Sequence, residues 1–177
     1  MSEEILARTR ESGYGGEPAL EDVFEASYRR LVIQMYGVVG DLSEAEDLVQ
    51  EAFVRAASSG RRFLAVDNHE AWLRRTAVNL QRNRWRKLRN FSRIQHRLEK
   101  PTDPPGLEEH VVVIEALRSV PEPQRQVLAL HYLADLSVDD IATTLGLAAG
   151  TVKSRLGRGR QAMAAALGPA EGGTFDA

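Results

Sequence analysis

The chain has 177 residues, of which 43% are hydrophobic and 27% are charged, with a formal net charge of −2 and no cysteine. This length suits one domain or two small ones, and the absence of cysteine excludes disulfides and thiolate metal sites. No apolar run is long enough to cross a bilayer, and the acidic N-terminus lacks the apolar core of a secretion signal, so we expect a cytoplasmic protein.

The first two segments of the chain differ in their hydrophobic pattern. Residues 1–18 are polar, include three glycines and lack periodicity, which indicates a flexible arm. From Leu20 to Val39 apolar side chains recur at the spacing of one helix face, so an amphipathic helix is predicted. Gly37 and Gly40 indicate that this helix ends near them.

Two further helices are predicted before a proline-rich segment. Ser43 and Glu46 have the spacing of a capping box, and the helix that they begin runs to about Ala57. After a loop around Gly60, a third helix begins near residue 68 and continues through a basic block toward residue 98.

This basic block, from Arg74 to Lys100, contains ten lysines and arginines and one acidic residue, whereas the chain up to Glu51 is acidic. The segregation predicts two partners, a nucleic acid and a protein of complementary charge. The stretch Trp72–Lys87 also mixes two tryptophans with arginines and asparagines. Such a mixture suits single-stranded DNA, because aromatic rings stack on bases while arginines follow the backbone. The alternatives are a solvated helix face for the charges and a core position for Trp72.

Residues 100–106 contain three prolines and a glycine, cannot continue a helix and are predicted to be an interdomain linker. Beyond them, hydrophobic spacing predicts helices near 107–119, 122–134, 137–145 and 150–167, followed by a disordered tail at 169–177. No strand pattern of useful length is present. The predicted fold class is all-α, with two small helical domains at 19–99 and 107–168, of which the second contains a helix-turn-helix.

The segment Leu136–Arg160 is the most informative part of the sequence. Ser137 can cap a first helix, Gly146 has the backbone freedom to end it, and Thr151 opens a second helix. Ala142 is small where the two helices would cross. The second helix leaves a basic outer face that can meet phosphates and base edges in a major groove, which is typical of a DNA-binding helix-turn-helix.

Two glycines conflict with this assignment locally. Gly157 and Gly159 lie inside the predicted recognition helix, where each should cost about 1 kcal/mol relative to alanine. Packing or DNA binding would have to offset this cost. The alternative interpretation of the segment is an amphipathic helix whose basic face is simply solvated.

The order of three motifs resembles one protein family. Asp47–Ala56 comes first, Trp72–Asn79 follows it, and the helix-turn-helix comes after the linker. Over about Leu20–Leu167 the chain resembles the extracytoplasmic-function (ECF) sigma factors of bacterial RNA polymerase, within the sigma-70 family, and is similar to an actinobacterial type. The resemblance implies a factor that directs core enzyme to specific promoters and melts the minus-10 element, with no catalytic activity and no cofactor of its own.

The resemblance also implies three sets of site residues, with no catalytic residue and no metal ligand among them. Those implied to bind core polymerase are Asp47, Gln50, Glu51 and Phe53. Those implied to bind minus-10 DNA are Phe63, Asn68, Arg75, Asn79, Arg82, Asn83, Arg84, Trp85 and Arg86. Those implied to bind the minus-35 duplex are Thr151, Lys153, Ser154, Arg155 and Arg158.

The partners implied by the resemblance are core RNA polymerase, through its clamp helices and flap, promoter DNA and an anti-sigma factor. One alternative is an autonomous regulator that binds duplex operator DNA with the helix-turn-helix alone. Another is an enzyme acting on nucleic acid. The acidic cluster at Glu44, Glu46 and Asp47 lacks a partner set for two-metal chemistry, and the four histidines show no ligand spacing, which argues against that alternative.

Overall fold

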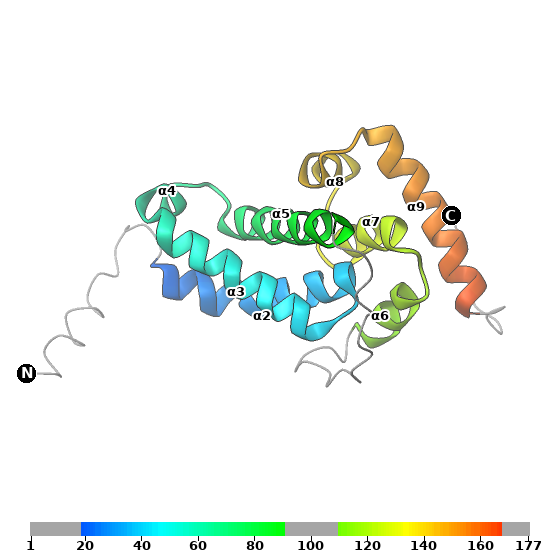
Figure 1. The fold of residues 1–177 in the computed structure, drawn as a ribbon, viewed down its shortest axis with the longest axis horizontal. Helices are drawn as coiled ribbons and strands as arrows, with labels where there is room; N and C mark the ends of the chain where they lie inside the picture. The colour runs from blue at the N-terminus through cyan, green and yellow to red at the C-terminus, as the bar shows by residue number, and fades with distance from the viewer. Residues whose placement is uncertain (1–18, 91–109, 168–177) are drawn as a thin grey trace, which may run out of the picture.

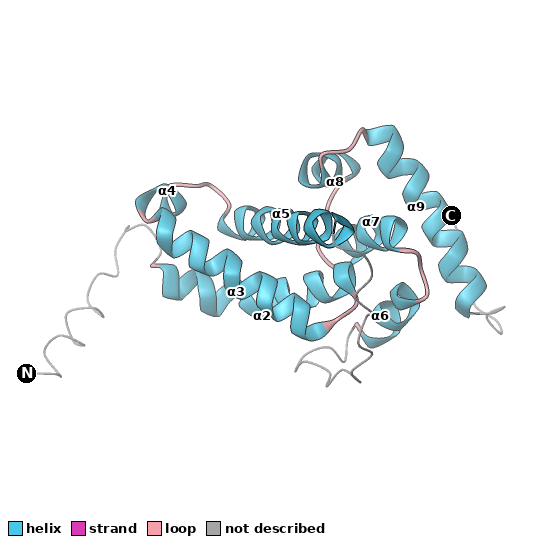
Figure 2. Ribbon diagram, viewed as in Figure 1, coloured by secondary structure: helices cyan, strands magenta, loops and turns pink. Residues whose placement is uncertain are grey.

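The computed structural model describes residues 19–90 and 110–167, and the regular structure in these two ranges is helical (Figure 1, Figure 2). In chain order the helices are α2 (Leu20–Val39), α3 (Leu42–Ser59), α4 (Arg61–Leu64), α5 (His69–Asn90), α6 (Val111–Arg118), α7 (Glu122–Tyr132), α8 (Val138–Leu145) and α9 (Ala149–Leu167). The all-α prediction is confirmed. The predicted arm, linker and tail at 1–18, 100–106 and 169–177 lie outside the described residues.

Helices α2, α3 and α5 pack side by side as a three-helix bundle, with α4 at one end of it (Figure 1). Their apolar faces meet in a core that includes Tyr36, Leu48 and Leu73, all of which are fully buried. Most of the stability of a helix in a protein comes from packing of its apolar face, so the burial of these faces stabilises all three helices.

Local capping explains where α3 begins. The carboxylate of Asp41 accepts a hydrogen bond from the Glu44 N–H at 2.7 Å, and Asp41 has the extended backbone that an N-cap requires. Ser43 already lies inside the helix. The predicted capping box at Ser43 and Glu46 is therefore wrong by two residues, whereas the predicted bounds of α2 are confirmed.

Helices α6 to α9 form a second group that packs against the end of the bundle, with α7 against α2 and α8 against α5 (Figure 1). The core of this group includes Leu117, Leu128, Ile141, Val152 and Leu156. The buried side chains of the two groups join in one continuous hydrophobic cluster.

Candidate nucleic-acid interface

Helices α8 and α9 form the predicted helix-turn-helix. At the start of α8 the Ser137 hydroxyl accepts a hydrogen bond from the Asp140 N–H at 3.1 Å. Gly146 ends α8 with a left-handed backbone (φ 64°), and its N–H bonds to the Ala142 carbonyl. A side chain would be strained at this φ, which explains the glycine. Helix α9 begins at Ala149, slightly earlier than the sequence suggested.

Helix α9 has a buried side and a polar side. Val152 and Leu156 face the core. Four of the predicted minus-35 residues share the i, i+3, i+4, i+7 spacing of one helix face, which we call the α9 face: Thr151, Ser154, Arg155 and Arg158. Arg158 donates a hydrogen bond to the Ser154 hydroxyl at 3.0 Å, and both residues are exposed. Lys153 is exposed on the flank of the helix, outside this face.

The two glycines of α9 have different surroundings. A Cβ at Gly159 would lie 2.6 Å from Leu128 Cδ1 and 3.2 Å from Gln124 Cβ, so α9 crosses α7 too closely here for a side chain. A Cβ at Gly157 would meet nothing within 4 Å. Close packing therefore explains Gly159 and leaves Gly157 without a packing role.

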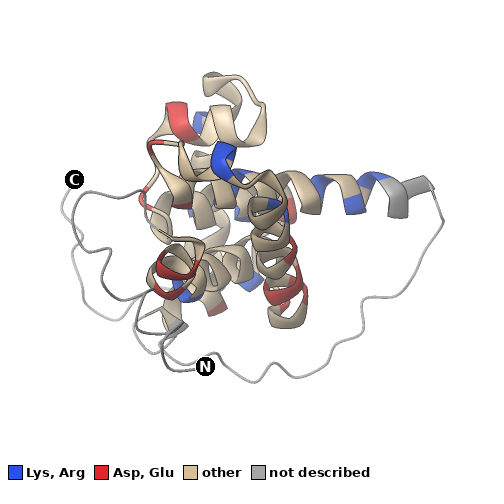
Figure 3. Ribbon diagram, turned by 90° about the vertical axis from the view of Figure 1, so that its left-hand side faces the viewer, with Lys and Arg blue, Asp and Glu red and all other residues tan. Residues whose placement is uncertain are grey.

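Helix α5 carries an exposed stripe of cationic and amide side chains. Its members, which we call the α5 stripe, are Arg75, Asn79, Arg82, Asn83 and Arg86. With 3.6 residues per turn, these positions fall within about 100° around the helix axis and extend along it for roughly 17 Å. Figure 3 shows Lys and Arg segments on the part of this helix that projects past the rest of the molecule. The stripe offers a continuous row of hydrogen-bond donors to a nucleic-acid strand.

Two of the other residues predicted for minus-10 DNA stabilise the protein around the start of α5. Phe63 is 1% exposed and packs edge-on against the rings of His69 and Trp72, with ring centroids 5.0 Å apart in both pairs. Its ring cannot stack on a base in this conformation. Asn68 is exposed and caps α5, because its side-chain oxygen accepts a hydrogen bond from the Ala71 N–H at 2.9 Å.

The last two predicted minus-10 residues, Arg84 and Trp85, lie off the α5 stripe. Arg84 points to the opposite side of the helix and forms an ion pair with Glu51 of α3 at 3.1 Å. Trp85 is half-buried. Glu51 was predicted to contact a protein and Arg84 to contact DNA, so one ion pair connects two predicted surfaces.

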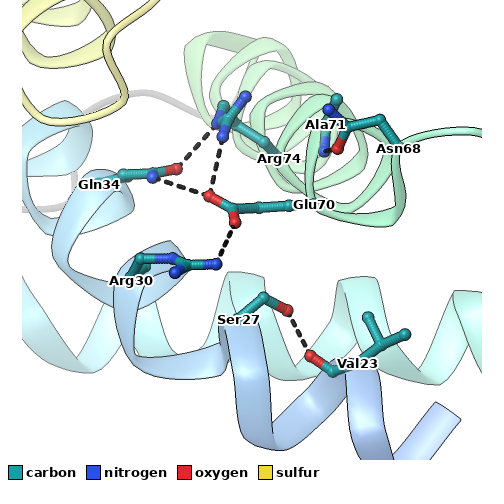
Figure 4. Close-up of polar contacts among 8 residues, drawn as sticks. All are labelled: Val23, Ser27, Arg30, Gln34, Asn68, Glu70, Ala71 and Arg74. Atoms are coloured by element: carbon teal, nitrogen blue, oxygen red, sulfur yellow. Dashed lines mark hydrogen bonds and ion pairs between the residues drawn. The ribbon is translucent and has the colours of Figure 1, made fainter. Parts of the chain in front are cut away.

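An ion-pair network ties α2 to the first turns of α5 (Figure 4). Glu70 Oε2 accepts a hydrogen bond from Arg30 at 2.7 Å, and Oε1 accepts from Arg74 at 3.0 Å and from Gln34 at 3.2 Å. Burial alone would raise the pKa of Glu70. The hydrogen bonds from Gln34 and Arg30 and the charges of Arg30 and Arg74 outweigh burial and hold this pKa below its ordinary value of 4.5.

The same network shows that the basic block is not wholly a DNA-facing surface. Arg74, its first arginine, is buried, and its Nε donates a hydrogen bond to the Gln34 side-chain oxygen at 2.8 Å. This side chain is committed to the contact between α2 and α5. Arg75, the next residue, is exposed and begins the α5 stripe.

An open pocket of about 440 Å³ lies beside this network, between α2 and the residues that lead into α5. Its walls are formed by Asp22, Val23, Ala26, Ser27, Arg30, Asp67, Asn68, His69 and Glu70. Of these, the sequence predicted only Asn68 as a site residue. The polar residues of α2 were missed because their spacing is that of an ordinary solvated helix face.

The outer face of α3 is acidic and amide-bearing, with one apolar residue. Asp47, Gln50, Glu51 and Val54 share one side of the helix at i, i+3, i+4 and i+7, and we call this set the α3 face. Val54 is 63% exposed. The sequence predicted the other three residues and missed Val54, because a valine in an amphipathic helix has the pattern of a core residue.

Phe53, the fourth residue predicted to bind core polymerase, is directed toward α2. It is 7% exposed, and its ring lies 5.0 Å from that of Phe24 and 6.1 Å from that of Tyr28. Phe24 stacks on Tyr28 at 4.6 Å and is 43% exposed. Gln50 donates a hydrogen bond to the Tyr28 hydroxyl at 3.4 Å. This aromatic cluster extends the α3 face onto α2.

Within residues 19–90 and 110–167, no group of three or more acidic, histidine or cysteine side chains is arranged to hold a metal ion. In the same part of the chain, no helix combines the length and the apolar character needed to cross a membrane. The candidate sites described above are three polar helix faces, an aromatic cluster and an open pocket.

Two family sequence patterns match separate parts of the chain. The family described as Sigma-70 region 2 matches residues 23–91, which contain nearly all of α2 to α5. The family described as Sigma-70, region 4 matches residues 110–163, which contain α6 to α8 and most of α9. The two matches coincide with the two groups of helices.

Several proteins are similar along most of their length. The ECF RNA polymerase sigma factor SigW of Bacillus subtilis is 30% identical over 176 residues, covering 90% of this chain and 94% of SigW. The ECF RNA polymerase sigma factor SigC of Mycobacterium tuberculosis is 29% identical, covering 94% of this chain and 93% of SigC. The solved structure of the sigma factor RpoE in complex with the anti-sigma factor NepR, from Bartonella quintana, is similar with a TM-score of 0.60 and 25% identity, over 81% of this chain and 92% of that chain.

Proposed function

This chain belongs to the extracytoplasmic-function group of sigma-70 factors, and we propose on that premise that it brings core RNA polymerase to bipartite promoters and opens their minus-10 elements. In this role residues 19–99 form the domain that binds polymerase and minus-10 DNA, and residues 107–168 form the domain that binds minus-35 DNA. RNA synthesis stays with the core enzyme, in the cytoplasm.

The α9 face is the proposed reader of the minus-35 duplex. A helix fits into the major groove of B-DNA, where an arginine can bond a guanine edge in two places or bind a phosphate. Arg155 and Arg158 supply these groups, and Thr151 and Ser154 add hydroxyls beside them. Lys153, on the flank, is placed for a phosphate contact.

The α5 stripe is the proposed track for the opened non-template strand of the minus-10 element. Its arginines follow the phosphates, while the side-chain amides of Asn79 and Asn83 can both donate to and accept from base edges. Trp85 lies off the stripe and is half-buried, and its exposed part adds an aromatic surface beside these side chains. Captured bases lose their stacking in the duplex, which costs a few kcal/mol per base, so the stripe must supply compensating contacts.

The residues before α5 complete this minus-10 site in the proposal. Asn68 lines the open pocket, which has room for an extruded base. Phe63 holds the preceding turn in place through its contacts with His69 and Trp72. We therefore assign Asn68 a role in base contact and Phe63 a role in shaping the site.

The α3 face and the neighbouring aromatic cluster are the proposed surface for the clamp helices of core polymerase. Exposed Phe24 and Val54 supply apolar area that gains from being buried, and Asp47 and Glu51 supply complementary charge. The flap of the polymerase would bind the 107–168 domain. Because the Bartonella relative is held by an anti-sigma factor, we propose an anti-sigma factor as a further partner of this chain.

The observation that carries this proposal is the separation of three surfaces on three helices, two of them cationic (α5 and α9) and one acidic and apolar (α3). An autonomous regulator of duplex DNA would need only the α9 face. A sigma factor needs all three, because it contacts duplex DNA, single-stranded DNA and a protein.

Reconstituted transcription tests the proposal. Core polymerase with this protein should give run-off products on promoters selected from a genomic library, with permanganate-reactive thymines at the minus-10 element. Replacing Asn79 and Asn83 together with alanine should abolish that reactivity while leaving the minus-35 contact in place. The absence of any promoter-dependent product, combined with tight binding of a palindromic duplex by the protein alone, would support the autonomous regulator instead.

A further inference from the structure

Gly157 of α9 is a glycine that neither its backbone nor its packing requires. Glycine destabilises the interior of a helix relative to alanine, so its presence there needs an offsetting gain. Among the described residues the glycines with a left-handed backbone are Gly40, Gly60 and Gly146, and Gly157 is not one of them. A Cβ at position 157 would meet no atom within 4 Å. The described part of the free chain therefore contains no contact that offsets the cost of this glycine.

The surface around Gly157 is the one that we assign to minus-35 DNA. Lys153 and Ser154 lie four and three positions before Gly157, and all three residues are exposed. With 3.6 residues per turn, Gly157 is about 40° from Lys153 and about 60° from Ser154 around the helix axis, so it lies between them. Arg158 follows in the sequence and donates a hydrogen bond to the Ser154 hydroxyl at 3.0 Å. A duplex that contacts Lys153 on one side and the α9 face on the other must pass over Gly157.

The dimensions of the major groove leave little room for a helix of ordinary thickness. The groove is about 12 Å wide, and a helix with its side chains is about 10–12 Å across. The Cα atoms lie only about 2.3 Å from the helix axis. At a glycine, DNA can therefore approach the axis up to about 3 Å more closely than at a residue with an average side chain.

We propose that the sugar–phosphate backbone of the minus-35 duplex crosses α9 at Gly157, and that Lys153, one turn earlier, binds a phosphate of the same strand. This contact rests on the proposed function, since it forms only if α9 binds the minus-35 duplex. A glycine has no side chain with which to read a base edge, so the part of the duplex that meets it is the backbone at the wall of the groove. The ammonium of Lys153 is a compact positive charge suited to a phosphate. The DNA contact supplies the gain that offsets the cost of glycine in α9.

Side chains of increasing size at position 157 test this contact in the holoenzyme. The probe is a labelled duplex that carries the minus-35 element of a promoter selected by run-off transcription. Gly157→Ala should weaken binding severalfold and Gly157→Leu by about tenfold or more, because each side chain holds the strand away from the helix. The affinity for core polymerase should not change.

The stability of the variants separates a lost contact from a damaged fold. Gly157→Ala should resist urea better than the wild type, because alanine favours the helix and its Cβ meets no atom. A variant that is more stable and yet binds DNA less tightly has lost a contact with DNA. Ala164→Leu is the matched control, because Ala164 is exposed on the same side of α9 seven positions later, and it should bind the duplex like the wild type.

The salt dependence of binding identifies the part of the duplex that is contacted. Lys153→Ala should lower the magnitude of the slope of the logarithm of the binding constant against the logarithm of the salt concentration by about one, through the loss of one phosphate contact. Gly157→Leu should lower it by the same amount, because it moves that phosphate away from Lys153. The double variant should show no further change in slope.

Equal affinities of the wild type and Gly157→Leu for the duplex would overturn the contact at Gly157, and so would an equal loss in Ala164→Leu. A loss in Gly157→Leu with an unchanged salt slope would indicate a base contact and overturn the backbone crossing. A wild-type holoenzyme that binds no selected duplex more tightly than a scrambled one would overturn the proposed function, and this contact with it.

Discussion

The two glycines of α9 differ in what an added side chain would meet. Their alanine variants should therefore change stability in opposite directions. Gly159→Ala should lower the free energy of unfolding by about 1–3 kcal/mol, because the new Cβ would overlap Leu128. Gly157→Ala should raise it by up to about 1 kcal/mol, because its Cβ meets no atom and alanine favours the helix. Urea unfolding of both variants beside the wild type measures the difference. Effects of the same sign would contradict a close crossing at Gly159 alone.

Exposure was the property of single residues that the sequence predicted least well. Phe53 and Phe63 were predicted as contact residues and are buried, while Arg74 of the basic block is buried in an ion-pair network. Phe24 and Val54 were not predicted and are exposed. Helical spacing shows which residues share a face, but the neighbouring helix that covers a face is set by tertiary packing.

Arginines on different sides of α9 should have different effects on DNA binding. In the holoenzyme, Arg158→Ala should weaken binding of a minus-35 duplex. If the side chain reads a base, the binding free energy should fall by about 1–3 kcal/mol. If it binds a phosphate, the slope of the logarithm of the binding constant against the logarithm of the salt concentration should fall in magnitude by about one. Arg160, which donates a hydrogen bond to the Tyr132 hydroxyl at 3.1 Å, is the matched control on the same helix. Titration of labelled duplex at several salt concentrations measures the affinity and its salt dependence for each variant. Equal losses in the two variants would argue against a specific α9 face.

The α3 face makes a separate prediction about core polymerase. Val54→Arg should weaken core binding severalfold or more, because it places a cation where the proposed interface buries an apolar side chain. The fold should be unaffected, since Val54 is 63% exposed. Val54→Ala, which places no charge at the same position, is the matched control. Competition with a labelled sigma factor for core enzyme reports the affinities. The assignment fails if Val54→Arg binds like the wild type or if the control loses as much.

The helix bounds could be predicted from the sequence where they depend on residues close to the helix end. The bounds of α2 and the caps of α8 at Ser137 and Gly146 are confirmed, because each depends on residues within one or two turns. Helix α4 was missed, since four residues are too few to show a periodicity. The start of α3 was misplaced because both Asp41 and Ser43 can cap a helix, and only backbone conformation distinguishes them.

At the scale of the molecule, the order of the motifs was enough to indicate the family, but not how the two groups of helices meet. Arg125 has the pattern of an ordinary surface arginine in the sequence, and its hydrogen-bond acceptors, the carbonyls of Val38 and Val39, are 87 and 86 positions away. Gly37 was interpreted only as a sign that the helix end is near, and it is also a point of close approach to α7. Contacts over such separations leave no periodic signal, so only the three-dimensional structure shows the junction.

The single hydrophobic cluster shared by α2–α5 and α6–α9 bears on how the chain unfolds. Two segments that match separate families would ordinarily be treated as independent cooperative units. Helix α2 covers part of α7, so we expect amide hydrogens on both helices to exchange through one shared opening reaction. We therefore expect the two groups to unfold together as one cooperative unit, which a domain boundary drawn on the sequence does not convey.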